Sequence, residues 1–100
     1  MRKIIWSPKA RADFEKQITY IAGQNVQNAV LVQSRVDASA KNLASVPTGR
    51  AGRVFGTYES PVLKTSLILV YELTDPQTLN IVRLIHGARN WQAGKWPEED

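Results

Sequence analysis

One hundred residues, 43% of them hydrophobic and 22% charged, have the size and composition of a single soluble globular domain and exclude a disordered chain. The absence of cysteine excludes a disulfide framework and a thiolate metal site, and with one histidine we expect neither metal nor cofactor. Three of the nine acidic residues end the chain, so thirteen Lys and Arg oppose six acids over residues 1–97, which indicates a nucleic acid or acidic protein partner, or simply a soluble basic surface.

The first half of the chain predicts a strand followed by two helices. Residues 3–6 are rich in β-branched and aromatic side chains and stop at Ser7-Pro8, which starts a helix because serine caps an orphan N–H and proline fits the first turn. Apolar residues then recur at helical spacing through about Ala22, and again from about Val26, after Asn25 as a cap. The link between the helices is so short that they form an antiparallel hairpin. The two apolar stripes are Phe14, Ile18 and Ile21, and Ala29, Val32, Val36, Ala40 and Leu43.

A loop and a weak strand follow the second helix. Proline and glycine residues break regular structure over residues 46–53, a loop that carries Arg50 and Arg53. Residues 54–63 contain enough apolar and aromatic side chains for a strand. Pro61 cannot donate to a ladder, so this strand is predicted to be irregular or to lie at an edge.

The last third of the chain predicts a β-hairpin. Residues 66–73 are apolar enough to form a central strand, residues 74–77 have turn chemistry, and residues 79–86 resume as a strand. The order β-α-α-β-β-β predicts an α+β fold in which the helical hairpin packs on one face of a small antiparallel sheet, because this buries both apolar surfaces. We expect a single domain over residues 1–100, with residues 92–100 a loosely held tail.

The apolar runs are too short for export or membrane insertion. Residues 4–6 are shorter than the apolar region of a signal peptide, and the run from Leu67 to Tyr71 is far below membrane-spanning length. The sequence therefore predicts a cytoplasmic protein without membrane contact.

Short segments in a fixed order, over nearly the whole chain, resemble one family. They are Ile5–Ala10, Asp13, Tyr20–Ala22, Val46-Pro47, Gly49-Arg50, Gly52–Val54, Gly56-Thr57, Val70-Tyr71 and Val82–Trp91. Their order, spacing and total length together resemble ParE-type toxins of the RelE/ParE toxin–antitoxin superfamily. The chain departs from that pattern at Tyr58, where ParE-like chains often carry arginine, and at Pro61.

The resemblance implies a toxin that is neutralised by a cognate antitoxin encoded beside it, in a toxin–antitoxin hetero-oligomer of the kind linked to plasmid stabilization. ParE-type members are associated with inhibition of DNA gyrase, which requires no catalytic residue of the toxin. RelE-type members of the same fold cut mRNA on the ribosome. Because a fold alone does not choose between them, gyrase inhibition by direct protein binding is the first hypothesis and a ribosome-dependent mRNA endoribonuclease is the alternative.

The predicted target-binding residues are four arginines and a tryptophan. Arg50 and Arg53 lie in a glycine-containing loop, and the guanidinium fork suits a carboxylate or a phosphate. Arg83 belongs to the last strand, and Arg89 and Trp91 follow it as residue types that are enriched in binding hot spots. The alternatives are a solvated arginine loop and a tryptophan that packs over the sheet edge.

The nuclease alternative uses one histidine and three arginines. Metal-free RNA cleavage needs an acid, a base and cations near the phosphate, which His86 with Arg53, Arg83 or Arg89 could supply, and Glu59 could act opposite the histidine. Residues three apart in a regular strand point to opposite faces, which weakens the pairing of Arg83 with His86. His86 is otherwise expected to close the strand through a backbone hydrogen bond, and Glu59 to be a solvated strand residue.

An antitoxin needs an apolar groove or face on the toxin. The second helix carries apolar residues outside its buried stripe, and Val26, Val30 and Leu31 are the predicted antitoxin-binding residues.

Overall fold

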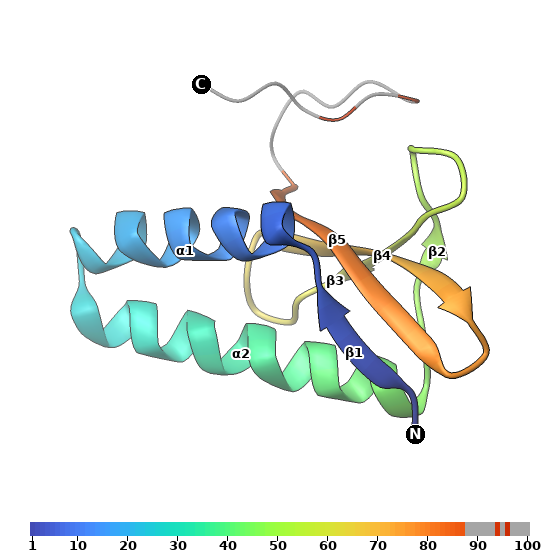
Figure 1. Ribbon diagram of the computed structural model, residues 1–100. Coiled ribbons are helices and arrows are strands. Elements are labelled where there is room, and N and C mark those ends of the chain that lie inside the picture. Colours follow the sequence, from blue (N-terminus) through green and yellow to red (C-terminus); the bar gives the residue numbers. More distant parts are fainter. Residues whose placement is uncertain (88–93, 95, 97–100) are drawn as a thin grey trace.

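The computed structural model describes residues 1–87, 94 and 96, and these form two helices and five strands in one mixed sheet (Figure 1). The α+β class and the helix hairpin are confirmed. The sheet order is β1-β5-β4-β3-β2, which places the predicted central strand, β4, at its middle. The elements are β1 (Lys3–Trp6), α1 (Pro8–Ala22), α2 (Val26–Ser45), β2 (Arg50–Ala51), β3 (Tyr58–Pro61), β4 (Leu67–Asp75) and β5 (Thr78–His86).

Both helices begin at the side-chain caps that the sequence predicts. The Ala10 backbone N–H donates to Ser7 Oγ at 3.0 Å, and the Asn28 N–H donates to Asn25 Oδ1 at 2.9 Å. The predicted stripe of α2 is buried throughout, and that of α1 packs against the same core as partly buried residues. Neither helix combines the length and apolar character needed to cross a bilayer, among the residues that the structure covers.

The sheet contains one parallel strand pair at the β1 edge. β1 runs parallel to β5, while β2, β3, β4 and β5 pair antiparallel in sequence order. Short turns dictate antiparallel pairing in the β4–β5 hairpin, where the Gln77 N–H donates to Asp75 Oδ1 at 2.7 Å. No turn constrains β1, because the helices and three strands separate it from β5 in the chain. The sheet is therefore mixed where the sequence indicated an antiparallel one.

The strand predicted over residues 54–63 is confined to β3. Residues 54–57 form a turn, and β3 lies between β2 and β4 rather than at an edge. Pro61 is compatible with this internal position because β2 pairs with Glu59 and Tyr58 alone, so the ladder on that side ends before the proline. The edge-strand prediction is wrong because the two-residue strand β2 is too short to give a periodic signal.

Side chains of α1 replace the missing neighbour along one part of β5. β1 pairs with β5 as far as Ile81, and beyond this residue β5 has no strand on that side among the described residues. Ser7 Oγ donates to the Val82 carbonyl at 2.9 Å, and the Leu84 N–H donates to Asp13 Oδ2 at 3.0 Å. These two contacts satisfy backbone groups that an open sheet edge would leave unpaired, and they fix α1 against β5.

Candidate functional site

The arginine-bearing loop is built around a buried carboxylate. Glu59 on β3 is 2% exposed, and its Oε2 accepts the Arg53 backbone N–H at 2.7 Å. Arg53 Nε lies 3.9 Å from Glu59 Oε1, which accepts no hydrogen bond from the residues that the structure covers. Arg50 pairs with Glu59 in the ladder and is exposed. The expectation of a solvated Glu59 is wrong, because the loop folds over its carboxylate.

The turn at residues 54–57 presents an aromatic ring to solvent. The Val54 carbonyl accepts from the Thr57 backbone N–H at 3.2 Å and from Thr57 Oγ1 at 2.6 Å, which closes the turn. Gly56 has φ +84°, as the third position of a type II turn requires. Phe55 occupies the second position and is fully exposed (101%). We call residues 52–57 the Phe55 loop.

Arg83 of β5 forms a nearly buried ion pair with Asp13 of α1. It is 7% exposed, and its Nε and Nη2 donate to Asp13 Oδ2 and Oδ1 at 2.7 and 3.2 Å. Its guanidinium carbon lies 5.4 Å from the ring centroid of Trp96. Arg83 therefore binds α1 to β5 and has little surface for a target.

Two of the predicted target-binding arginines, Arg50 and Arg83, lie far apart in the sheet. Arg50 and Arg83 lie in one row of the ladder, through Glu59 and Val70, but two strands separate them. At the usual strand spacing their Cα atoms are about 14 Å apart. Arg50 and Arg53 thus form one site on the β2 side, and Arg83 belongs to the α1–β5 contact. The predictions for Arg89 and Trp91 lie outside the residues covered.

Within the described residues, the candidate nuclease residues come from two parts of the sheet, His86 and Arg83 from β5, and Arg53 and Glu59 from the loop after β2 and from β3. His86 is half-buried at the end of β5, where it pairs in register with Leu67. Arg83 is committed to Asp13, Arg53 lies in the loop after β2, and Glu59 is covered by that loop. No three His, Asp or Glu side chains gather as a metal-binding group in the part of the chain that the structure describes.

Two stacked tyrosines support the base of the loop. The rings of Tyr58 and Tyr71 lie 5.5 Å apart at an interplanar angle of 25°, and Tyr71 OH donates to the Thr48 carbonyl at 2.6 Å. Burial raises the pKa of Tyr71, the neighbouring Tyr58 raises it further, and the Arg2 cation opposes both. Tyr71 therefore holds its proton and keeps donating to the chain segment that leads into β2.

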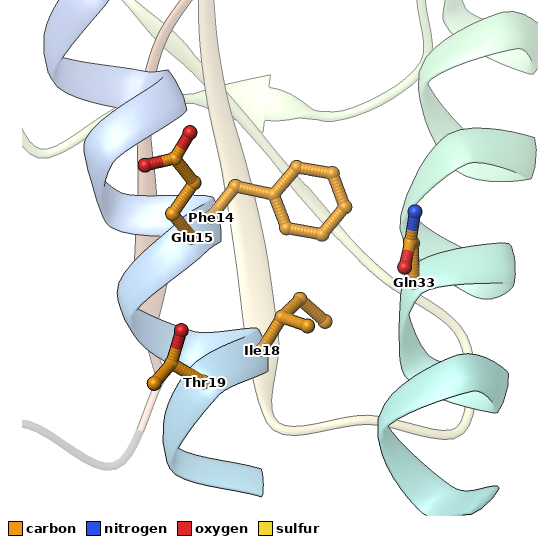
Figure 2. Close-up of a pocket in the computed structure, with 5 residues that line it drawn as sticks. All are labelled: Phe14, Glu15, Ile18, Thr19 and Gln33. Atoms are coloured by element: carbon orange, nitrogen blue, oxygen red, sulfur yellow. The ribbon is translucent and has the colours of Figure 1, made fainter. Parts of the chain in front are cut away.

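The first half of α2 exposes the predicted antitoxin-binding residues. Val26, Val30 and Leu31 are each more than half exposed. A cavity of about 300 Å³ also opens between the helices (Figure 2), where Phe14 and Ile18 of α1 point toward Gln33 of α2. The helix hairpin therefore offers exposed apolar side chains and a recess to a partner.

Sequence reasoning missed Phe55 and Asp13. Both had a weak signal. Phe55 stands between Gly52 and Gly56, and an aromatic residue in such a loop has few ways to reach a core. Asp13 is an acidic residue on the apolar side of the first predicted helix, next to Phe14, which suggests a buried partner.

One comparison with known proteins identifies a family, and a second finds a similar fold. The family model described as "ParE toxin of type II toxin-antitoxin system, parDE" matches residues 4–91. The fold is similar to a solved chain described as "Chromosomal ParDE TA system from P. aeruginosa", with a TM-score of 0.76 and 19% identity over 86% of this chain and 96% of that one. A search of curated proteins gives no significant sequence match.

Proposed function

Because its residues 4–91 match the family model, this chain belongs to the ParE toxin family of type II toxin–antitoxin systems, and we propose that it inhibits DNA gyrase by direct protein binding. A cognate antitoxin neutralises it in a hetero-oligomer. The two act in the cytoplasm, where gyrase works, and such a pair would stabilise a plasmid that encodes it. The family match is the observation that carries this proposal.

The disposition of charged residues supports a binder over a nuclease. Arg83, which the nuclease mechanism would use, is held by Asp13 at 2.7 Å. Arg53 and His86 lie on segments that the sheet separates by β3 and β4. A toxin that acts through surface contact needs no acid–base pair, whereas cleavage of RNA needs both groups at one phosphate. The proposed target surface is therefore Arg50 and Arg53, with Arg89 and Trp91 as further candidates.

The proposed antitoxin site is the exposed apolar face at the start of α2. Val26, Val30 and Leu31 would pack against an apolar segment of the antitoxin, which removes their side chains from water. Substitution of Val30 by Asp places a charge in that contact and should weaken the complex while the free toxin keeps its fold, because the residue is 62% exposed.

Purified toxin tests the proposed target directly. The expected result is a loss of gyrase supercoiling activity as toxin is added, and recovery of that activity when the antitoxin is added in equal amount. Gyrase that remains fully active at saturating toxin would refute the proposal. Transcript cleavage on ribosomes that disappears in a His86→Ala variant would establish the nuclease alternative.

A further inference from the structure

We propose that the Phe55 loop is a preformed anchor that inserts the Phe55 ring into an apolar pocket with an acidic rim on the toxin's protein target. This inference rests on the proposed function, because the target is the protein whose inhibition makes the chain toxic. It adds a contact residue that lies outside the predicted arginine and tryptophan set.

Phe55 is exposed on a loop whose backbone is held by several hydrogen bonds. The loop is closed by the two bonds to the Val54 carbonyl, by Gly52 N–H donating to the Thr57 carbonyl at 2.7 Å, and by Arg53 N–H donating to Glu59. The backbone that carries the fully exposed phenyl ring is thus held in one place. A loop held this way loses little backbone freedom when its ring binds a partner, and this lowers the entropic cost of binding.

The shape of the loop leaves no room for a side chain at position 52. A Cβ on Gly52 would lie 2.3 Å from Thr57 Oγ1 and 3.1 Å from the Thr57 carbonyl carbon, so the two strands of the loop approach as closely as glycine permits. Beneath them, the Glu59 carboxylate is buried with one oxygen unbonded by the covered residues. A buried carboxylate needs hydrogen bonds or a counter-charge, and the contacts of Glu59 with the Arg53 N–H and guanidinium both come from the loop.

The charges beside Phe55 specify the partner's chemistry. Arg53 is two residues away in the loop and Arg50 is exposed on β2. Their guanidinium groups favour carboxylates around the pocket that takes the ring, by charge complementarity. A nucleic acid would also attract the arginines, but a phenyl ring at the tip of a tight turn fits a protein pocket better than a stacked duplex.

The position of the loop separates this contact from the proposed antitoxin site. The Phe55 loop lies at the β2 side of the molecule, while the first turns of α2 lie at the opposite end (Figure 1). One partner on α2 therefore leaves the loop accessible, and the two contacts can be lost independently.

Substitution of Phe55 by Ala tests the inference, with Leu63→Ala as the matched control. Leu63 is also apolar and 76% exposed, but lies in the β3–β4 connection. We expect Phe55→Ala to keep the melting temperature and the antitoxin affinity of the parent and to bind purified gyrase about 30-fold more weakly, the ratio for a hot-spot residue. Leu63→Ala should match the parent in all three measurements. Gly52→Ala, which reshapes the loop without removing the ring, should also weaken gyrase binding.

Three outcomes would overturn the inference. The first is a Phe55→Ala variant that binds gyrase as tightly as the parent. The second is a Phe55→Ala variant that loses antitoxin binding but stays toxic. The third is a Phe55→Ala variant that loses self-association but stays toxic, which would assign the loop to a contact with a second copy of the chain. Growth arrest separates this inference from the proposed function. If the parent arrests growth without affecting gyrase, the proposed function fails, and the effect of Phe55→Ala on that arrest still decides whether the loop contacts the target.

Discussion

Two arginine–carboxylate pairs in this small toxin differ in almost every physical respect. Asp13 and Arg83 meet at 2.7 Å, with both side chains nearly buried, and the aspartate accepts three hydrogen bonds. Glu59 and Arg53 lie 3.9 Å apart, one side chain 2% and the other 31% exposed, and the glutamate accepts one backbone N–H. The first pair fastens a helix to the sheet, and the second shapes a loop.

The Asp13–Arg83 contact stabilises the fold, whereas the Glu59–Arg53 contact sets the shape of the exposed loop. A buried ion pair with its hydrogen bonds satisfied resists loss of either partner, because the remaining charge would be buried alone. In the loop pair the guanidinium reaches solvent, so the glutamate shapes the backbone while its arginine stays partly available. Variants of the two carboxylates should therefore separate folding from target binding.

Asp13→Ala should give the largest loss of stability. It leaves the Arg83 cation buried and the Leu84 N–H without its acceptor, which costs about 3–5 kcal/mol of unfolding free energy. Urea denaturation measures this as a lower midpoint at an unchanged slope.

The control for Asp13 is Asp37→Ala, an exposed aspartate on α2, which should change the unfolding free energy by less than about 0.5 kcal/mol. A second substitution, Arg83→Met in the Asp13→Ala chain, removes the cation that Asp13 had neutralised and should recover much of the loss. A double variant no more stable than Asp13→Ala would show that the aspartate acts by some means other than pairing with Arg83.

Glu59→Ala should lower the unfolding free energy less than Asp13→Ala does, and it should weaken target binding more. It removes the acceptor of the Arg53 N–H, at a cost of about 1–3 kcal/mol of unfolding free energy, and it releases the backbone of the Phe55 loop. The Glu59→Ala variant should therefore bind gyrase more weakly, because its loop is less ordered. The Asp13→Ala variant, measured below its melting temperature, should bind gyrase as the parent does. Glu59→Gln retains an acceptor and should lie between Ala and the parent. Equal destabilisation by Glu59→Ala and Asp13→Ala would remove the distinction between the pairs.

The sequence predicts the fold well because most of its elements have strong local signals. Ser7-Pro8 and Asn25 mark the helix starts, and the α2 stripe predicts the buried side of that helix. The parallel β1–β5 pair and the two-residue strand β2 lack such signals, because the first depends on distant segments and the second is shorter than any period.

The candidate site was less predictable because charge alone does not reveal burial. Arg50, Arg53 and Arg83 look alike in the sequence, yet their roles depend on Glu59 and Asp13, which approach from other elements. Residue spacing does not identify the partner that a residue meets from another element. The same limit hid the exposure of Phe55, since a phenylalanine is usually counted toward a core.

Tyr71→Phe should give the smallest effect, and one that depends on pH. At neutral pH it loses the bond to the Thr48 carbonyl, about 0.5–1.5 kcal/mol. Because burial and Tyr58 raise the pKa of Tyr71 in the folded chain, its stabilisation is fully present below the unfolded value near 10 and is lost as the pH rises through the folded value. The difference in unfolding free energy between parent and variant should therefore be constant to about pH 10 and shrink above it. If the difference in unfolding free energy instead grew above about pH 10, the folded protein would favour the ionised form of Tyr71, and the prediction would be wrong.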